Sequence, residues 1–387
     1  MAGAEALAEV SRFELTDSSL LADVAALRER FGQRSAALVE TIRLRRRAVV
    51  KFASLADVSD WLFTDEALQQ ATTAAVARHR ARRLAGADVH DATCSVGTEL
   101  AALRDTAEFV VGSDIDEVRL AMAHHNVPQV ALFRADALRP ITGGAIGRDT
   151  VVLLDPARRG GGRRRFDPRA YTPPLDELFE VYRDRPTVVK CAPGIDFDAV
   201  RGLGFDGEVE VTSSGGSVRE TCLWSHALAE PGVRRRATIL DRDEVLTDAD
   251  HDDCRVSAPG RWIVDPDGAV VRAGLVRQYA TRHGLWQLDP DIAYLSGDRL
   301  PDGVRGFEVL ERVPLREKVL RQALSARDCG ALEILVRGVD VDPDALRRRL
   351  RPGGGQPLSL VITRIGTGTD ARAVVFVCRA NYAGLNP

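Results

Sequence analysis

Residues 89–98 read Val-His-Asp-Ala-Thr-Cys-Ser-Val-Gly-Thr, and the character of the chain changes within them. A short apolar segment reaches Asp91 and then gives way to small, turn-forming residues as far as Gly97. The next residues, 99–103, read Glu-Leu-Ala-Ala-Leu, a pattern typical of a helix. This order predicts a strand, a tight loop and a helix, with backbone N–H groups of the loop available to a ligand.

Three more apolar segments follow, and each ends in an acid or a loop of small residues. Residues 109–113 run into Asp114, about 20 residues after the first loop, where βα folds place an acid on a ribose hydroxyl. Residues 132–137 contain Asp136, and the strongly apolar strand 151–154 ends in Asp155. Four strands with the same ending predict an α/β fold with a ligand at the carboxyl edge of its sheet.

The order and chemistry of these segments resemble class I S-adenosylmethionine-dependent methyltransferases, which have a Rossmann-like fold. The resemblance implies that residues 91–97 wrap the methionine part of the cofactor, Asp114 binds the ribose, Asp136 meets the adenine, and Asp155-Pro156 forms the acceptor-side motif. The cofactor-binding residues that it implies are Asp91, Ala92, Thr93, Cys94, Gly97, Asp114, Ile115, Asp136 and Ala137.

The loop departs from the usual family pattern of about three glycines, because Thr93, Ser95 and Val96 fill most of those places. A variant of the form Asp-Ala-Thr occurs in some RNA methyltransferases. The alternative is a doubly wound fold that binds NAD or a nucleotide. The chain has neither a GxGxxG motif nor a P-loop Gly-Lys-Ser near the strand, which disfavours that alternative.

Two residues further along the chain suggest a second chemistry. The spacing of residues 155–158, Cys191 and Glu220 is similar to RNA 5-methyluridine methyltransferases, although their Ser-Cys-Asn-Pro is Lys-Cys-Ala-Pro here. That resemblance implies that Cys191 adds to the pyrimidine ring and that Glu220 removes the ring proton, since a pyrimidine C5 needs such activation. The alternatives for Cys191 are a small residue in the acceptor pocket and a buried core thiol.

A nitrogen acceptor needs no covalent step, and this is the mechanism we favour. Proximity, alignment and a hydrogen-bond acceptor such as the Asp155 carboxylate or a backbone carbonyl suffice. The predicted catalytic residues are therefore Asp155, Pro156, Cys191 and Glu220.

Residues 158–166, directly after the acceptor-side motif, carry five arginines around three glycines. Guanidinium groups bind phosphates with two hydrogen bonds, and Phe166 could stack on a base. The alternative is a solvated loop without a ligand. The predicted substrate-binding residues are Arg158, Arg159, Arg163 and Arg164.

Composition limits the classes of protein. The length of 387 residues suggests two or three domains, and the net charge of −3 means that a nucleic-acid partner would have to meet a local basic patch. The six cysteines form no CxxC pair, so the sequence predicts neither a zinc site nor disulfides, and a reducing cytoplasm is expected. No apolar run approaches the roughly 18 residues of a membrane span. We expect a cytoplasmic protein without metal or membrane partners.

Residues 1–75 read as helices, one of which carries Arg43-Leu44-Arg45-Arg46-Arg47. This segment could cover the cofactor site or clamp the substrate, or it could be an extension packed on the sheet. The arginine run could contact nucleic acid or be a solvated helix face. We expect three parts: the helical segment 1–75, the cofactor-binding domain 76–232 and a further domain 233–387.

The predicted domain 233–387 alternates strands and helices, with one helix expected over 273–283, and reads as a compact α+β domain. Residues 284–298 resemble a hallmark of actinobacterial methyltransferases that end in a THUMP-like domain. THUMP domains are RNA-binding modules, so the resemblance implies tRNA or rRNA as the acceptor. Arg347, Arg348, Arg349 and Arg351 are candidate phosphate contacts or, equally, a solvated face.

Three functions are consistent with the sequence. The first is a methyltransferase acting on a base nitrogen of tRNA or rRNA. The second is a methyltransferase acting on a protein or small molecule, which the acidic net charge favours. The third is an RNA-associated protein that binds the cofactor without catalysis, which the glycine-poor loop suggests.

Overall fold

The computed structural model describes residues 3–52, 57–141, 146–158, 167–366 and 371–382. The chain forms two compact units. The first unit comprises Met1–Ser214 with Arg219–Pro231, and the second comprises Gly215–Val218 with Gly232–Pro387. The borders at 75/76 and 232/233 that we expect from the sequence stay predictions.

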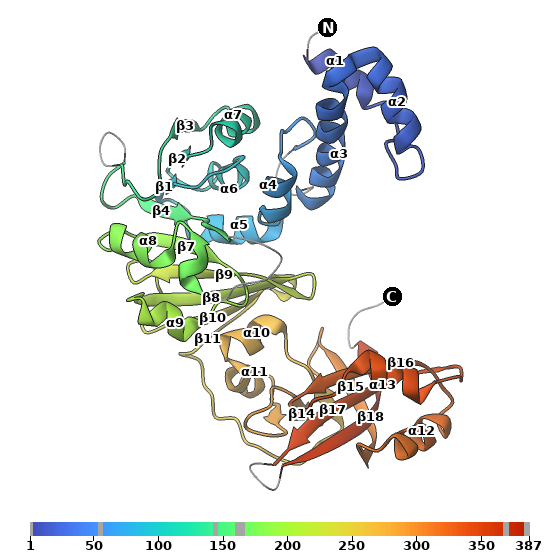
Figure 1. Cartoon of the computed structure of the whole chain (residues 1–387). Coiled ribbons are helices and arrows are strands. Elements are labelled where there is room, and N and C mark those ends of the chain that lie inside the picture. Colours follow the sequence, from blue (N-terminus) through green and yellow to red (C-terminus); the bar gives the residue numbers. More distant parts are fainter. Residues whose placement is uncertain (1–2, 53–56, 142–145, 159–166, 367–370, 383–387) are drawn as a thin grey trace. The chain divides into compact units, whose positions relative to one another are not determined.

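Helices make up the beginning of the first unit (Figure 1). Their bounds are α1 Gly3–Val10, α2 Leu20–Phe31, α3 Ser35–Phe52, α4 Asp65–Gln70 and α5 Ala74–Arg83. The first three share a core that includes Val10, Leu27 and Ile42. The carboxyl half of α3 enters a different core together with Trp61, Leu68 and the loop residue Val96. The N-terminal helices are therefore packed against the loop that we expect to hold the cofactor.

Three arginines of the run on α3 bind backbone carbonyls and a carboxylate of the same chain. Arg45 Nε donates to the carbonyl of Trp61 at 3.0 Å, and Arg46 Nη2 donates to the carbonyls of Ser11 and Phe13. Arg47 Nη1 lies 2.5 Å from the Asp65 carboxylate. These three guanidinium groups tie loops to the helix, which favours packing over contact with nucleic acid.

The sheet of the first unit is mainly parallel, as the sequence predicts. Its strands run in the order β8-β9-β7-β4-β1-β2-β3. The elements are β1 Asp88–Asp91, α6 Thr98–Leu103, β2 Phe109–Asp114, α7 Glu117–Asn126, β3 Ala131–Arg134, β4 Val151–Leu154, β5 Ala157–Arg158, β6 Tyr171–Thr172, α8 Leu175–Val181, β7 Thr187–Cys191, α9 Phe197–Gly202, β8 Gly207–Ser214 and β9 Ser217–Ser225. The neighbours from β3 to β7 are parallel, whereas β9 is antiparallel to β7.

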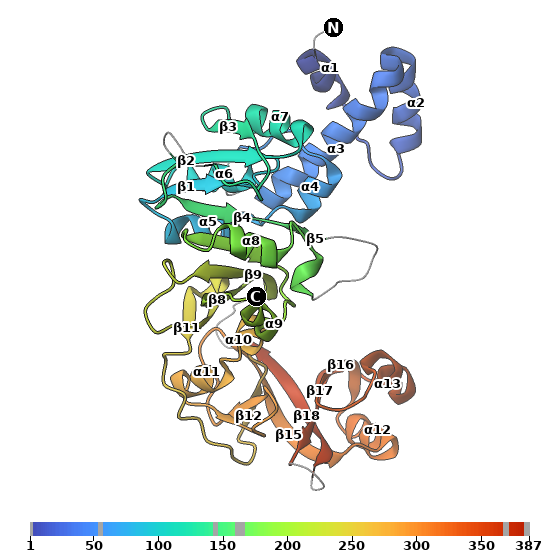
Figure 2. The ribbon, with the colours of Figure 1, turned by 60° about the vertical axis from the view of Figure 1, so that its left-hand side comes forward.

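The strand order reverses at β1, which has β2 on one side and β4 on the other (Figure 2). An open α/β sheet leaves a crevice at the carboxyl ends of its strands at such a switch point. Both faces of the sheet are covered at strand β4. Val152 and Leu154 pack into the core with α8 on one face, and Val151 and Leu153 pack into the core with α5 and α6 on the other. This alternation is the period of two expected of a strand. The Rossmann-like α/β prediction is confirmed.

The second unit is an α+β unit, as predicted. Its larger sheet runs β13-β14-β12-β15-β18-β17-β16, with β16 and β17 parallel. The elements are β10 Arg235–Ile239, β11 Glu244–Thr247, β12 Trp262–Val264, α10 Gly268–Ala273, α11 Val276–Arg282, β13 Trp286–Gln287, β14 Leu295–Gly297, β15 Arg305–Pro314, α12 Glu317–Ser325, β16 Cys329–Arg337, α13 Pro343–Leu350, β17 Gln356–Ile365 and β18 Arg372–Tyr382.

Two details of the second unit bear on the sequence expectations. The helix expected over 273–283 is present as α11, but it begins three residues later, because Gly274, with φ +72°, ends the preceding helix α10 as a left-handed cap. The segment 284–298 lies in the interior: Leu288, Ile292 and Tyr294 are buried in one core. Most side chains of this segment therefore serve packing, whereas those of Pro290, Asp291 and Asp298 are exposed.

Among the described residues, no helix is both long and apolar enough to cross a membrane. The same residues contain no group of three or more His, Cys, Asp or Glu side chains placed to hold a metal ion. All six cysteines lie in the described parts of the chain, where each is buried and none is in a disulfide.

Candidate active site

The loop after β1 is held by backbone hydrogen bonds to its two neighbouring strands. The amide of Ala92 donates to the carbonyl of Leu153 on β4, and that of Cys94 donates to the carbonyl of Ser113 on β2, both at 2.9 Å. Ser95 takes a left-handed conformation with φ +49°, which is uncommon for a residue other than glycine. The turn that the family usually makes with glycine is made here by a serine.

Gly97 is the one position in the loop where glycine is required. Its φ is +90°, and a Cβ built on it would lie 2.9 Å from Cγ2 of Val127. A larger residue would meet both backbone strain and a clash with the core behind the loop. Gly97 ends the loop and caps α6.

Asp114, at the end of β2, organises the neighbouring backbone. Its Oδ2 accepts the amide of Ser95 at 2.8 Å, and its Oδ1 accepts the amide of Asp116 at 2.9 Å. The next residue, Ile115, is 60% exposed, although it is large and apolar. A carboxylate beside an uncovered apolar side chain suits a ligand with hydroxyl groups next to a flat ring.

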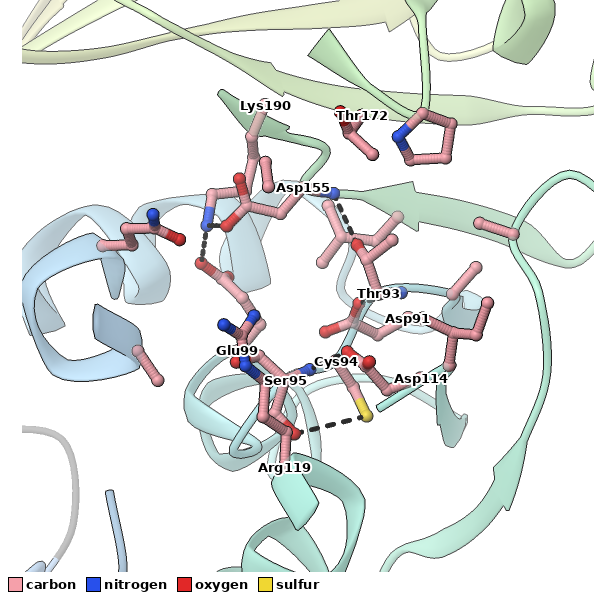
Figure 3. A pocket seen from close by; sticks show the side chains of 18 of the residues that line it. Asp91, Thr93, Cys94, Ser95, Glu99, Asp114, Arg119, Asp155, Thr172 and Lys190 are labelled. Atoms are coloured by element: carbon pink, nitrogen blue, oxygen red, sulfur yellow. Dashed lines mark hydrogen bonds and ion pairs between the residues drawn. The ribbon is translucent and has the colours of Figure 1, made fainter. Parts of the chain in front are cut away.

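A cavity of about 600 Å³ opens over the loop and the ends of β1, β2 and β4 (Figure 3). Every predicted cofactor-binding residue lines it except Gly97, the last residue of the loop. Lining residues that sequence reasoning did not identify as site residues are Ala67, Gln70, Ala71, Thr98, Glu99, Arg119, Ala135, Leu138, Leu153, Ala157, Thr172, Pro173, Pro174, Glu177 and Lys190. The first three show that the N-terminal segment completes this cavity.

A second cavity of about 540 Å³ adjoins the first. The two share five lining residues, among them Asp155 and Lys190. All four predicted catalytic residues, Asp155, Pro156, Cys191 and Glu220, line this second cavity, together with Lys51, Gln69, Thr72, Thr73 and Arg219. The structure therefore brings the four predicted catalytic residues together, although the first and the last of them, Asp155 and Glu220, are 65 positions apart in the chain.

A chain of paired charges, all buried except Asp155, runs beside the two cavities. Lys190 Nζ lies 2.5 Å from Asp155 Oδ2 and 3.1 Å from Glu99 Oε1 (Figure 3). Arg80 Nη1 lies 2.5 Å from Glu99 Oε2, and its Nη2 pairs with Glu220. Opposite charges thus alternate from Asp155 through Lys190, Glu99 and Arg80 to Glu220.

The ionisation of this chain follows from its pairing. Burial alone would raise the pKa of Glu99, but Arg80 and Lys190 lower it to about 2. Burial would lower the pKa of Lys190, but Asp155 and Glu99 raise it above its usual value. Both groups therefore stay charged at neutral pH, and the ammonium group of Lys190 holds the carboxylate of Asp155 from one side.

Two of the predicted catalytic residues, Cys191 and Glu220, are engaged inside the protein: the first is buried in a core and the second is in an ion pair. Cys191 is 3% exposed and belongs to the apolar core with Leu154 and Tyr171. Glu220 is bound to Arg80 and accepts from Thr72 Oγ1 at 3.5 Å.

The arginine loop can be placed only at its first residue. Arg158 ends β5, and its backbone pairs with that of Tyr171. Arg159, Arg163 and Arg164, which we predicted to bind substrate, lie outside the described residues.

Comparison with known proteins identifies the family. Two uncharacterized S-adenosylmethionine-dependent methyltransferases, from two strains of Mycobacterium tuberculosis, are each 63% identical over 360 residues, which cover 91% of this chain and 99% of the relative. The chain belongs to the S-adenosylmethionine-dependent methyltransferases. The methyltransferase resembles, at 20% identity and a TM-score of 0.74, the crystal structure of a "putative methyltransferase" from Porphyromonas gingivalis W83, over 98% of this chain and 99% of that one. This likeness shows the fold.

Family models match two parts of the methyltransferase. Residues 304–380 match a model described as THUMP domain-like, which agrees with the THUMP-like domain that the sequence predicts. Residues 1–48 match a domain of unknown function. S-adenosylmethionine is the cofactor, which disfavours the NAD alternative.

The first cavity fits S-adenosylmethionine on three observations. Residues 91–96 of its loop line the cavity, and Gly97 keeps the turn tight. The Asp114 carboxylate and the exposed Ile115 are placed for a ribose and a flat base. Asp91 supplies a carboxyl group for a cationic part of the cofactor, at the end of β1.

Asp91 gives the methyltransferase a dependence of stability on pH. Burial, together with the charge of Glu99, raises the pKa of Asp91 to about 8 in the folded protein. Because the pKa of Asp91 is higher in the folded than in the unfolded protein, the protonated carboxyl contributes to stability. This contribution is fully present below pH about 4 and is lost as pH rises through about 8. In the absence of cofactor, the free energy of unfolding of the wild type should therefore fall by about 2 kcal/mol between pH 6 and pH 8, relative to that of Asp91→Asn.

Urea denaturation of both proteins at the two pH values checks this expectation. Asp88→Asn, an exposed change at the other end of β1, is the matched control and should follow the wild type. Equal pH dependence in the wild type and Asp91→Asn would show that the Asp91 carboxyl is ionised throughout.

Proposed function

We propose that this methyltransferase methylates a base nitrogen of tRNA or rRNA. The observation that carries the proposal is the position of Asp155, whose side chain lines both the cofactor cavity and the adjoining cavity. Its amide donates to Thr93 Oγ1 at 2.6 Å, and its carboxylate is held by Lys190. An acceptor in the second cavity can therefore meet the cofactor at this residue.

Asp155 can orient a nitrogen without changing its own covalent state. The cofactor supplies an electrophilic methyl group. A carboxylate that accepts an N–H of the acceptor fixes the direction of the nitrogen lone pair, and alignment of this kind is a large part of catalysis for a transfer between two bound groups. The ion pair with Lys190 keeps the carboxylate in one place for this purpose.

The environment of Cys191 supports nitrogen over carbon as the acceptor atom. A carbon acceptor would require an accessible thiolate. The side chain of Cys191 is enclosed by an apolar core, and Glu220, which would remove the ring proton, is engaged by Arg80.

The size of the second cavity supports a single base as the group that enters it. A volume of about 540 Å³ lies in the range of pockets for small molecules. A base in an RNA helix would have to leave its stack to reach Asp155, as bases do in other enzymes that modify them. A free small molecule fits the same volume and is the second candidate acceptor.

The second unit supports RNA over a small molecule. The THUMP domain-like match, over residues 304–380, covers the strands β15 to β18 of its larger sheet. THUMP domains are RNA-binding modules. Arg316, Lys318, Arg348 and Arg351 are exposed on or beside α12 and α13. Local positive charge on a chain with net charge −3 is the pattern expected for a patch that binds phosphates.

The test is transfer of labelled methyl from S-adenosylmethionine to total RNA from cells that lack the gene, followed by nucleoside analysis. We expect label in one nucleoside with the methyl group on nitrogen. Protein and small-molecule fractions of the same cells are assayed in parallel. Label confined to either of those fractions would overturn the proposal.

A binding measurement accompanies the transfer assay. Filter binding of the same RNA should weaken steeply as salt increases, because phosphate contacts release counterions. A flat response to salt would count against RNA as the acceptor.

A further inference from the structure

Lys51, near the end of α3, brings an amino group of the N-terminal segment to the second cavity. Its Nζ donates to the carbonyl of Leu68 at 2.7 Å and to that of Gln69 at 3.2 Å. A tetrahedral nitrogen bonded to Cε and directed at two carbonyls has one position left. That position holds a hydrogen in the ammonium form and a lone pair in the neutral amine.

The surroundings of Lys51 favour loss of the extra proton. Burial, then the positive charges of Lys190 and Arg47, lower the pKa of Lys51 to about 8. Other charges near it are already paired: Arg47 with Asp65 on α4, and Lys190 with Asp155 and Glu99. Of the remaining charged groups on this cavity, Glu220 pairs with Arg80, and Arg219 Nε donates to the carbonyl of Ser214. On α4, Glu66 pairs with Arg119.

We propose that Lys51 is the general base that takes the proton from a ring N–H of the acceptor, as in the lactam edge of guanine, whose exocyclic amine leaves an N–H for Asp155. This role rests on the proposed function, because it requires a nitrogen acceptor in the second cavity. The chemical class follows from the need for a base. The nitrogen of a lactam is conjugated with its carbonyl, so it becomes a good nucleophile only when its proton leaves, whereas an exocyclic amine has no such requirement.

The step balances without a further reactant. The N–H proton goes to the lone pair of Lys51 Nζ, and the electron pair of the N–H bond stays on the ring. The ring nitrogen forms its bond to the methyl carbon, and the electron pair of the broken C–S bond stays on sulfur. The ammonium group of Lys51 then faces Lys190 and Arg47 again, and it returns its proton to solvent before the next turnover.

Carboxylates in the same cavity are less suited to this step. The carboxylate of Glu220 is already paired with Arg80. The Asp155 carboxylate is also held by Lys190, which suits it to orient the ring while Lys51 takes the proton.

The test compares the wild type with Lys51→Arg and with Lys51→Cys alkylated by 2-bromoethylamine, which restores an amine of lower pKa than lysine. The native cysteines are all buried, which directs the alkylation to position 51. The substrate is total RNA from cells that lack the gene. Cofactor affinity is measured for each variant by calorimetry, since Lys51 does not line the cofactor cavity.

We expect the wild-type rate to rise with pH to a plateau, with a midpoint near pH 8. Lys51→Arg should lose at least tenfold in rate with unchanged cofactor affinity, since general-base catalysis typically contributes about 10²-fold or more. The alkylated variant should regain activity with its midpoint moved to lower pH. A residue with only a structural role would not move the midpoint.

An NMR titration of the Lys51 amine, in wild-type protein without RNA, gives a readout independent of activity. A midpoint near 8 is expected, and an ordinary lysine value of about 10.4 would overturn the role. Wild-type transfer to RNA with an equally fast Lys51→Arg variant would overturn this role alone. Absence of transfer to RNA by the wild type would overturn the proposed function, and this role with it.

Discussion

Replacement of Arg80 by methionine should lower the free energy of unfolding of the first unit by about 3–5 kcal/mol, the usual cost of removing one partner from a buried ion pair. Arg80 is 1% exposed and binds the carboxylates of both Glu99 and Glu220. Methionine would fill much of the volume but leave Glu220 without its cation and Glu99 with Lys190 alone. Urea denaturation, followed by a probe of the first unit, measures the effect.

Arg82→Met is the matched control, because Arg82 lies on the same helix, α5, and is exposed. We expect its effect to stay within about 0.5 kcal/mol. The double variant Arg80→Met with Glu220→Gln should recover part of the loss, since one uncompensated charge is removed. A loss below about 1 kcal/mol for Arg80→Met would mean that solvent reaches the two carboxylates.

Asp114→Ala should weaken the binding of S-adenosylmethionine about 100-fold, which corresponds to about 2.7 kcal/mol. The amide groups of Ser95 and Asp116 would lose their acceptors, so the loop would lose the hydrogen bonds that shape it. Two such bonds to a charged group contribute about 1.5–3 kcal/mol each, and the ribose would lose its partner as well. Calorimetric titration of both proteins with the cofactor measures the change.

Asp116→Ala separates this effect from general damage to the same segment. Asp116 caps α7 by accepting the amides of Val118 and Arg119, and it does not line the cofactor cavity. Loss of the cap should cost about 1 kcal/mol of stability and leave the cofactor affinity unchanged. If both variants bind the cofactor as the wild type does, Asp114 is not a cofactor ligand.

The sequence predicts the cofactor half of the site because its signals are local. Each strand is a short apolar run that ends in an acid, and parallel strands bring those ends to one edge of the sheet. Asp91, Asp114, Asp136 and Asp155 therefore all line one cavity, and their roles in it stay predictions. The loop has few glycines because it needs one only at Gly97, where a Cβ would clash with Val127. It could therefore be recognised from the rest of its sequence.

The buried charges could not be paired from the sequence, because their partners are far apart in the chain. Some signal was present, however. Arg80 falls in the apolar stripe of α5, with Ala77, Ala81 and Leu84 at helical spacing, so the periodicity places it inside. Lys190 interrupts an apolar strand in the same way. A charge at a core position indicates a buried partner, but only the tertiary structure shows that Glu99 lies between the two.

The N-terminal segment shows a different limit. Its helices were predictable from apolar spacing, and Thr64, whose side chain accepts the amide of Ala67, caps α4. Nothing local shows that Lys51 would face a cavity or that Arg46 would bind carbonyls of residues 11 and 13. These contacts depend on how α3 packs on the rest of the first unit, which short-range patterns do not encode.

The most direct test of RNA as the acceptor is a comparison of nucleosides, by mass spectrometry, in tRNA and rRNA from cells with and without the gene. The account predicts that one nucleoside methylated on a base nitrogen disappears when the gene is removed and returns when the wild-type gene is restored. An unchanged set of methylated nucleosides, or the loss of a carbon-methylated one, would contradict it.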